Sequence, residues 1–303
     1  MNRLKHEEEY RKLIDCAVSK IDIAVGTGGS GRFREAPARL PENLSVALQA
    51  LWQSAFCISI GDTKQFPPIR VTFSQSDFKA VFAKQRQVSL SHHIENAGRI
   101  TFRLRKNYRA RVHAAQWAQN VFYGDNMAVA HRTHTQATRN FLDWVTKTFV
   151  AFNTKFTTLM IRPSYVEESK IGTSFSNPGN ANFAMQLVVQ LYRLANILDA
   201  RDLNRRASVL FLTSYASQKN LYDLLLRELT PAGVPKSLVE VRMIDDSSSH
   251  EADIIIIDWV RTAKRGFISD PQRMAVALSR ARIGNHDWPW RRHYSRLASF
   301  APR

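Results

Sequence analysis

The stretch D-I-I-I-I-D, from Asp253 to Asp258, places four isoleucines in a row between two carboxylates. Continuous runs of β-branched residues are typical of strands that are buried on both faces of a parallel sheet. Other short apolar runs occur at residues 208–212 and 238–243, and stretches with helical spacing separate them. This alternation predicts an α/β fold, with ligands at the carboxyl ends of the strands.

The same patterns extend along the rest of the chain. We expect further strands at residues 21–25, 56–60, 100–104 and 157–162. We expect helices at residues 3–19, 44–52, 112–122, 136–149, 181–198, 217–229 and 271–281. The polar, proline-broken I-G-N-H-D-W-P-W at residues 283–290 predicts no strand after Arg282. Residues 69–100 are weakly patterned, which predicts a connection between residues 1–68 and a larger domain at residues 101–303.

The composition predicts a folded protein with a basic surface. Of its 303 residues, 44% are apolar, and 43 Lys and Arg against 26 Asp and Glu give a net charge of +17. Such an excess favours nucleic acid as a partner over a merely solvated surface. Dense basic patches lie at residues 103–111 and 290–296, and the candidate contacts to nucleic acid are Arg105, Lys106, Arg109, Arg111, Arg291 and Arg292.

Other classes of protein fit the sequence less well. No apolar run approaches the roughly 18 residues that indicate a membrane span, and the charged N-terminus does not resemble a secretory signal. We therefore expect an intracellular protein, cytoplasmic or nuclear, with no membrane partner. Cys16 and Cys57 lie in apolar contexts and are expected in the core. The nine histidines show no metal-ligand spacing, so we predict no metal-binding residues among them.

Glycine-rich phosphate-binding motifs are weak or missing. Gly26, Gly28 and Gly31 satisfy G-x-G-x-x-G, but Pro37 follows where the dinucleotide motif needs a helix. These glycines therefore predict a loop. The loop G-x-x-x-x-G-K-[ST], which cradles phosphates, occurs nowhere in the sequence.

Several short motifs follow one another in a fixed order. They are G-D-T-K-Q-F-P-P at 61–68, L-R-K-N-Y-R-A-R-V-H at 104–113, N-V-F-Y-G-D at 120–125, L-T-S-Y-A-S-Q at 212–218, H-E-A-D-I-I-I-I-D-W-V-R at 250–261 and Q-R-M-A-V-A-L-S-R-A-R at 272–282. Together they resemble the C-terminal half of superfamily-one helicases, in the group of the nonsense-mediated-decay RNA helicase. The resemblance implies a RecA-like fold of the P-loop NTPase type. Residues 1–68 would be a remnant of a first RecA-like domain, and residues 101–303 a second one.

The resemblance implies three catalytic residues. Arg109 and Arg280 would reach the phosphate that is transferred from ATP, and Gln65 would sense it. A planar guanidinium suits this role because phosphoryl transfer builds charge on the equatorial oxygens. An arginine on a solvated helix face is the alternative for either residue alone.

Further residues are implied to bind the nucleotide or the nucleic acid. Asp62 would help to hold Mg²⁺ and water, Tyr108 would stack on adenine, and Glu251 would contact the ribose or link nucleotide to nucleic acid. A core aromatic is the alternative for Tyr108. The segment that would touch single-stranded RNA or DNA contains Thr213, Tyr215 and Gln218. Strand-to-helix capping is the alternative for Thr213 and Tyr215.

The chain also departs from the family pattern. Glu35 and Ala36 stand in place of an Asp-Glu pair that binds Mg²⁺, three serines at 247–249 replace a Gln-Gly pair, and Ala275 replaces an Asn. The sequence begins too late to include the family's phosphate loop. ATP and Mg²⁺ are implied as cofactors, but these departures argue against tight binding. We therefore expect weak or no ATP hydrolysis by the chain alone.

Three functions stay open at this point. The first is a helicase-like module that binds single-stranded nucleic acid without hydrolysing ATP. The second is an active helicase subunit that is completed by a protein supplying the phosphate loop. The third is an interaction domain or remnant with no enzymatic activity.

Overall fold

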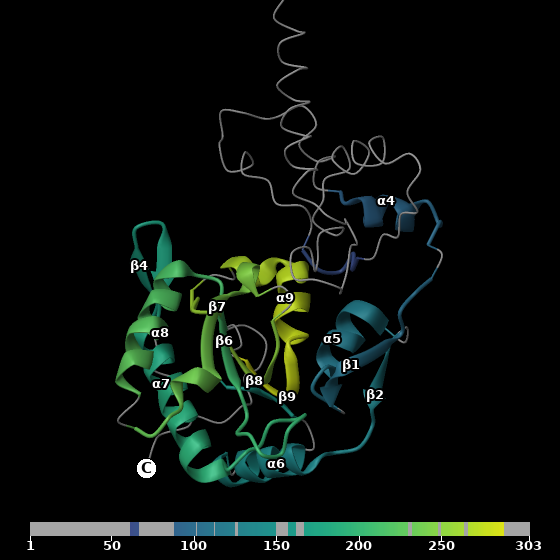
Figure 1. Cartoon of the computed structure of the whole chain (residues 1–303). Helices are drawn as coiled ribbons and strands as arrows, with labels where there is room; N and C mark the ends of the chain where they lie inside the picture. The colour runs from purple at the N-terminus through teal and green to yellow at the C-terminus, as the bar shows by residue number, and fades with distance from the viewer. Residues whose placement is uncertain are drawn as a thin grey trace, which may run out of the picture. The chain divides into compact units, whose positions relative to one another are not determined.

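A computed structural model describes residues 61–66, 88–100, 102–111, 113–124, 127–149, 157–161, 167–229, 232–247, 250–263 and 266–287 (Figure 1). The elements expected before residue 61, both cysteines, the glycine loop, Arg291 and Arg292 lie outside these residues. The chain divides into two compact units, residues 1–63 with 67–100 and residues 64–66 with 101–303. The segment 69–100, expected as a separate connection, is thus grouped with residues 1–63.

A five-stranded sheet forms the centre of the larger unit. Its order is β3 (Thr158–Met160), β9 (Ala281–Asp287), β8 (Ala252–Asp258), β6 (Val209–Thr213) and β7 (Val239–Met243). Every neighbouring pair is parallel. All residues of β6 and β8 are buried, as the run of isoleucines predicted. The predicted α/β class with a parallel sheet is confirmed.

Strand β9 shows that one prediction was wrong, because we expected no strand after Arg282. β9 lies between β3 and β8, and Gly284 pairs with Ile254. A strand in this position finds hydrogen-bond partners on both sides, and this tertiary context overrides the weak strand propensity of a polar sequence. Gly284 also allows the ring of Phe141 to approach the backbone closely.

Helices surround the sheet, and the expected positions hold within a few residues for most of them. α7 and α8 lie side by side (Figure 1). The α-helices are α4 (Leu90–Asn96, in the smaller unit), α5 (Gln116–Ala118), α6 (Gln136–Thr148), α7 (Pro178–Gln190), α8 (Ala216–Glu228) and α9 (Pro271–Leu278). α5 and α7 continue into π-helical turns, Gln119–Tyr123 and Leu191–Ala195. Short 3₁₀ turns lie at Lys236–Leu238, Ile244–Asp246 and Gly266–Ser269.

Two small sheets flank this arrangement. β1 (Lys106–Arg111) pairs in parallel with β2 (Ala128–His131), so the strand expected at 100–104 begins later than predicted. β4 (Ser169–Ile171) and β5 (Ser174–Ser176) form an antiparallel hairpin. Side chains cap four of the described helices, since Ser89, Thr135, Asn177 and Asp270 accept backbone N–H groups at the starts of α4, α6, α7 and α9. No helix in the described part of the chain is long and apolar enough to cross a bilayer.

The close approach at Gly284 yields a test of the sheet. A Cβ atom at this position would lie 2.4 Å from Phe141 Cε1 and 2.8 Å from the carbonyl oxygen of Thr157. Gly284→Ala should therefore destabilise the domain by about 1–3 kcal/mol in urea unfolding. The double variant with Phe141→Leu should be less destabilised than the sum of the two single variants, because the smaller side chain gives way. An unchanged stability of Gly284→Ala would contradict the placement of β9.

Candidate functional site

The three residues expected to be catalytic lie together. Arg109 on β1 donates from Nη1 to the carbonyl oxygen of Ser279 at 3.0 Å, so its guanidinium lies beside the residue that precedes Arg280. Arg280 follows α9 and is only 1% exposed. Its Nη2 donates to Oε1 of Gln65 at 2.8 Å, and its Nε donates to the carbonyl oxygen of Val276 at 3.1 Å. Two arginines and a glutamine, distant in sequence, therefore form one cluster.

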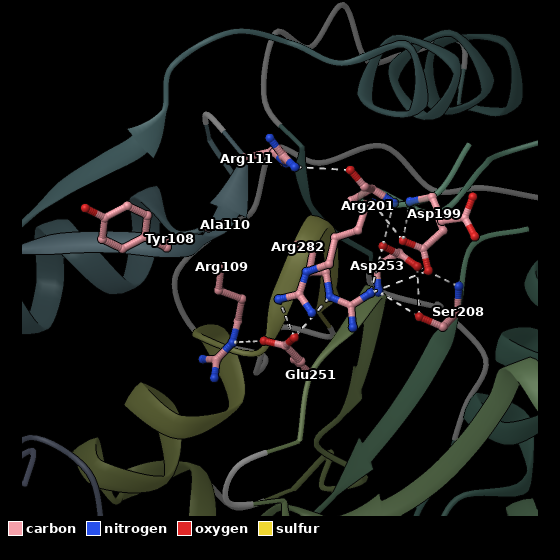
Figure 2. Close-up of polar contacts among 12 residues, drawn as sticks. Tyr108, Arg109, Ala110, Arg111, Asp199, Arg201, Ser208, Glu251, Asp253 and Arg282 are labelled. Atoms are coloured by element: carbon pink, nitrogen blue, oxygen red, sulfur yellow. Dashed lines mark hydrogen bonds and ion pairs between the residues drawn. The ribbon is translucent and has the colours of Figure 1, made fainter. Parts of the chain in front are cut away.

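Glu251 is surrounded by three arginines (Figure 2). Its Oε2 accepts from Arg109 Nε at 2.7 Å, and its Oε1 pairs with Arg201 Nη2 at 2.6 Å and Arg282 Nε at 3.4 Å. Burial acts to raise the pKa of Glu251, but the bond to Arg109 and the charges of the three arginines outweigh it. The pKa therefore lies below its ordinary value of 4.5.

A second carboxylate extends this cluster towards the sheet. Asp253 is fully buried and accepts from the backbone N–H groups of Ala200 and Ser208, at 3.0 and 2.8 Å. Arg282 Nη1 donates to its Oδ1 at 3.3 Å, so Arg282 joins Asp253 to Glu251. Neither Arg201 nor the bridging role of Arg282 was anticipated, because no motif in the sequence marks these contacts.

The position of the cluster differs from the expected one. We expected ligands at the carboxyl ends of the strands, whereas Glu251 and Asp253 lie at the amino end of β8, and Arg280 precedes β9. Arg280 lies here because it belongs to the turn between α9 and β9. The carboxyl ends instead hold the segment that contains Thr213, Tyr215 and Gln218.

Two further nucleotide-binding candidates are Tyr108 and Asp62. Tyr108 is 66% exposed, and in Figure 2 its ring extends away from Glu251. This exposure excludes the alternative of a core aromatic. Asp62 is half-buried and belongs to the smaller unit.

The residues expected to touch a single strand are buried. Thr213, Tyr215 and Gln218 are each at most 5% exposed. The amide of Gln218 is engaged on both sides, because Oε1 accepts from Asn177 N at 2.7 Å and Nε2 donates to Asp258 Oδ2 at 2.7 Å. These side chains therefore do not reach the surface in this structure, and their expected contact with nucleic acid remains a prediction for the segment as a whole.

Asp258 is the centre of a buried polar network that sequence reasoning missed. It also accepts from Tyr222 Oη at 2.8 Å, Asn180 Nδ2 at 2.7 Å and Val260 N at 2.8 Å. Burial raises the pKa of Asp258 above its ordinary value of 3.8, although the hydrogen bonds act to lower it. The only sequence signal was the carboxylate that ends the isoleucine run.

The network holds a strained turn after β8. Val260 has a φ of 64°, which is a rare conformation for a β-branched residue. Its N–H donates to Asp258, and its carbonyl oxygen accepts from Asn177 Nδ2 at 3.2 Å. Such strain persists only where the surroundings impose it, and it is often found at functional sites.

The hairpin β4–β5 is fixed to the same turn. Arg261 Nε pairs with Glu168 Oε1 at 3.0 Å, and its guanidinium carbon lies 3.9 Å from the centre of the Phe175 ring. Phe175 also meets Tyr215 edge to face, with ring centres 5.5 Å apart. Burial acts to raise the pKa of Glu168, but the N–H groups of Thr262 and the next residue, together with Arg261, lower it overall.

The cluster suits a nucleotide better than a metal ion. Guanidinium groups such as that of Arg109 bind phosphate oxygens, and the exposed ring of Tyr108 offers a stacking face. Arg280, which is 1% exposed, has to be uncovered before it can contribute in the same way. The described residues contain no group of three or more Asp, Glu, His or Cys side chains that could hold a metal. The neighbours of Glu251 are arginines, which compete with a cation, so this part of the chain does not fit Mg²⁺.

The parallel sheet and the paired arginines at its amino edge define a RecA-like α/β domain of the P-loop NTPase class. This chain belongs to the AAA domain family, AAA_12, whose model matches residues 86–285. Together with the relatives described next, the match identifies a UPF1-like superfamily-one helicase region, as the motifs predicted.

Three relatives illustrate the similarity. ATP-dependent helicase upf1 of Schizosaccharomyces pombe is 26% identical over 241 residues, which cover 75% of this chain and 23% of that protein. Regulator of nonsense transcripts 1 of Dictyostelium discoideum is 26% identical over 314 residues, which cover 93% of this chain and 21% of that protein. ATP-dependent helicase NAM7 of Saccharomyces cerevisiae is 27% identical over 237 residues, which cover 75% of this chain and 22% of that protein. The chain thus spans about a fifth of the length of these relatives.

The depressed pKa of Glu251 predicts a dependence of stability on pH. A carboxyl with a lowered pKa stabilises the folded state above its ordinary value of 4.5, and this contribution is lost as the pH falls through the folded pKa. Glu251→Gln should therefore be less stable at pH 7 and should lose less stability on acidification. Urea unfolding across the acid range measures both effects. Glu240→Gln, at a half-exposed carboxyl paired with Arg242, is the control. An equally steep acid limb in Glu251→Gln would refute the arrangement.

The network around Asp258 predicts an opposite pH dependence and a large effect of amide substitution. Because its pKa is raised, the contribution of Asp258 to stability falls as the pH rises from 3.8 through the folded pKa. The carboxylate of Asp258 has two oxygens that accept hydrogen bonds, whereas the side chain of Asn has only one. In Asp258→Asn, the NH₂ group that replaces the second oxygen therefore faces a donor. We expect a loss of about 1–3 kcal/mol in the free energy of unfolding at neutral pH. Asp223→Asn, at a partly exposed carboxyl paired with Lys219, should change the free energy of unfolding little. A stabilised Asp258→Asn would show that charge burial dominates instead.

Proposed function

We propose that this chain is the second RecA-like domain of a helicase-like protein, which binds single-stranded RNA or DNA and contacts the terminal phosphate of ATP. By itself it hydrolyses ATP weakly or not at all. The observation that carries the proposal is the convergence of Arg109, Arg280 and Gln65 on one edge of the sheet. Each of these residues was singled out from a different motif, and the fold brings all three together.

The arginines have a defined chemical task in this proposal. They bind oxygens of the phosphate that is transferred and neutralise the charge that develops on them. Arg280 is held by Gln65 and by the carbonyl oxygen of Val276, and Arg109 by Glu251 and the carbonyl oxygen of Ser279. Both guanidinium groups are thus oriented before any nucleotide binds, which lowers the cost of ordering them.

Hydrolysis requires more than these arginines. In P-loop NTPases a backbone cradle and its lysine hold the β- and γ-phosphates, and G-x-x-x-x-G-K-[ST] does not occur in the 303 residues. We therefore infer that turnover depends on a phosphate loop supplied from outside these residues, by a partner protein or another polypeptide segment. An active helicase completed in this way is the second candidate function, and the retained contact between Arg280 and Gln65 favours it over a remnant without activity.

The proposal of single-strand binding rests on the net charge of the chain and on its similarity to helicases. The net charge of +17 supports a polyanionic partner, and the relatives are named as helicases. Binding of this kind uses a basic surface and stacking, and it needs neither the phosphate loop nor a metal ion. It can therefore persist where ATP turnover does not.

The proposal predicts a separation of binding from catalysis. The purified chain should bind a labelled single-stranded oligonucleotide, with an affinity that falls about tenfold or more over a few-fold rise in salt. ATP turnover should stay at background with and without the oligonucleotide. Arg109→Ala should weaken the binding of a fluorescent ATP analogue about tenfold, since a charge-assisted bond is lost. Arg227→Ala, at an exposed arginine of α8, should leave it unchanged.

Two outcomes would contradict the proposal. Stimulated turnover that Arg280→Ala abolishes and Arg227→Ala preserves would make the chain an autonomous enzyme. Absence of any binding to single-stranded nucleic acid, in a sample with a cooperative thermal unfolding transition, would favour an interaction domain or remnant instead.

A further inference from the structure

The chain exposes an apolar segment directly before and within β1. Phe102 is 79% exposed, Leu104 73% and Tyr108 66%. Only Leu194, at 72%, is comparably exposed among the large apolar side chains of the described residues. Three strongly exposed apolar side chains within seven residues are unusual on a soluble domain and mark an interaction site.

Basic residues alternate with these apolar side chains. The segment reads F-R-L-R-K-N-Y, and Arg103, Arg105 and Lys106 are all exposed. Between Glu95 and Asp125 the sequence holds six Lys and Arg and no Asp or Glu. This segment of the chain therefore carries charge of one sign, which disfavours a purely apolar protein partner and favours a polyanion.

The side chains of β1 fall into two groups, those that turn inwards to the Glu251 cluster and those that are exposed. Arg109 and Arg111 turn inwards, where Arg109 reaches Glu251 and Arg111 Nη2 donates to the carbonyl oxygen of Ala200 at 3.1 Å. Lys106 and Tyr108 are exposed, whereas Ala110, two residues further along the strand, is buried. Figure 2 shows Tyr108 directed away from the arginines that surround Glu251.

We propose that Phe102, Leu104, Arg105 and Lys106 form a base-stacking platform for single-stranded nucleic acid, here called the 102–106 strip. This inference rests on the proposed function and adds the exposed apolar side chains of Phe102 and Leu104 to the cations Arg105 and Lys106, which the basic patch already marked as candidate contacts. Phe102 stacks on a base, Leu104 packs against the neighbouring base or sugar, and Arg105 and Lys106 bind the flanking phosphates. The strip spans at most roughly 14 Å, which limits it to a short run of nucleotides.

Exposed ring faces favour a single strand over a duplex. In a duplex the base faces are covered by their neighbours, so Phe102 has no face to stack on and only the cations contribute. In a single strand every base offers a π-face, and the interaction is tolerant of sequence. The platform therefore predicts a preference for single-stranded over duplex nucleic acid that depends on Phe102.

The test compares Phe102→Ala with Leu194→Ala, which removes a similarly exposed apolar side chain outside the strip. Fluorescence anisotropy measures the affinity for a labelled oligouridine and for a duplex of the same length, at several salt concentrations. Phe102→Ala should weaken binding to the single strand by about fivefold or more. Its affinity for the duplex and the slope of log affinity against log salt should not change, because no phosphate contact is lost.

A charge variant separates stacking from electrostatics. Arg105→Ala should weaken the binding of both the single strand and the duplex. For the single strand it should also reduce the slope of log affinity against log salt by about 0.7, because one phosphate contact is lost. Arg227→Ala is its matched control and should leave both slopes unchanged. Because all of these side chains are exposed, the variants should unfold at the temperature of the wild-type chain.

The outcomes distinguish this inference from the proposed function. If the wild-type chain binds oligouridine and Phe102→Ala binds it as tightly as Leu194→Ala does, the platform is wrong while the proposed function stands. Equal losses for single strand and duplex in Phe102→Ala would also overturn stacking. If the wild-type chain binds neither ligand, the proposed function fails, the platform fails with it, and a protein partner becomes the better occupant of the strip.

Discussion

The carboxylates of Asp253 and Asp258 are both fully buried, one near each end of the central strand β8. Burying a charged group is costly unless hydrogen bonds and opposite charges compensate it. Asp253 is compensated by backbone N–H groups, Ser208 and Arg282, and Asp258 by three side chains and one backbone N–H group. Meeting these requirements fixes the neighbouring strands, loops and helices at both edges of the sheet.

The carboxylates at the two edges of the sheet are compensated in different ways, so the two edges differ in their electrostatics. At the amino edge, arginines supply both charge and hydrogen bonds, so the carboxylate of Glu251 keeps a low pKa. At the carboxyl edge, the donors to Asp258 are neutral, and burial raises its pKa. The amino edge is therefore an electrostatic site with exposed cations nearby, whereas the carboxyl edge is a rigid, neutral support for the turn after β8.

The sequence predicted those features that depend on local pattern. Four isoleucines in a row predicted a strand that is buried on both faces. The order of the motifs predicted Arg109 and Arg280 as site residues before any contact was known. Strand β9 was missed because its pairing depends on β3 and β8, which lie far away in sequence. Burial of Gln218 was missed for the same reason, since a hydrogen bond to Asp258 leaves no periodic trace in the sequence. Long-range polar contacts are therefore the part of the site that only the fold reveals.

The left-handed turn at Val260 has an evolutionary consequence. Valine is a poor residue for this conformation, which glycine or asparagine adopts more readily. Asp258 and Asn177 bind its two backbone groups and hold this conformation, so the three positions are not independent. Among descendants of this sequence, loss of either polar partner is expected to be followed by a glycine or asparagine at position 260, and the three should vary as a set.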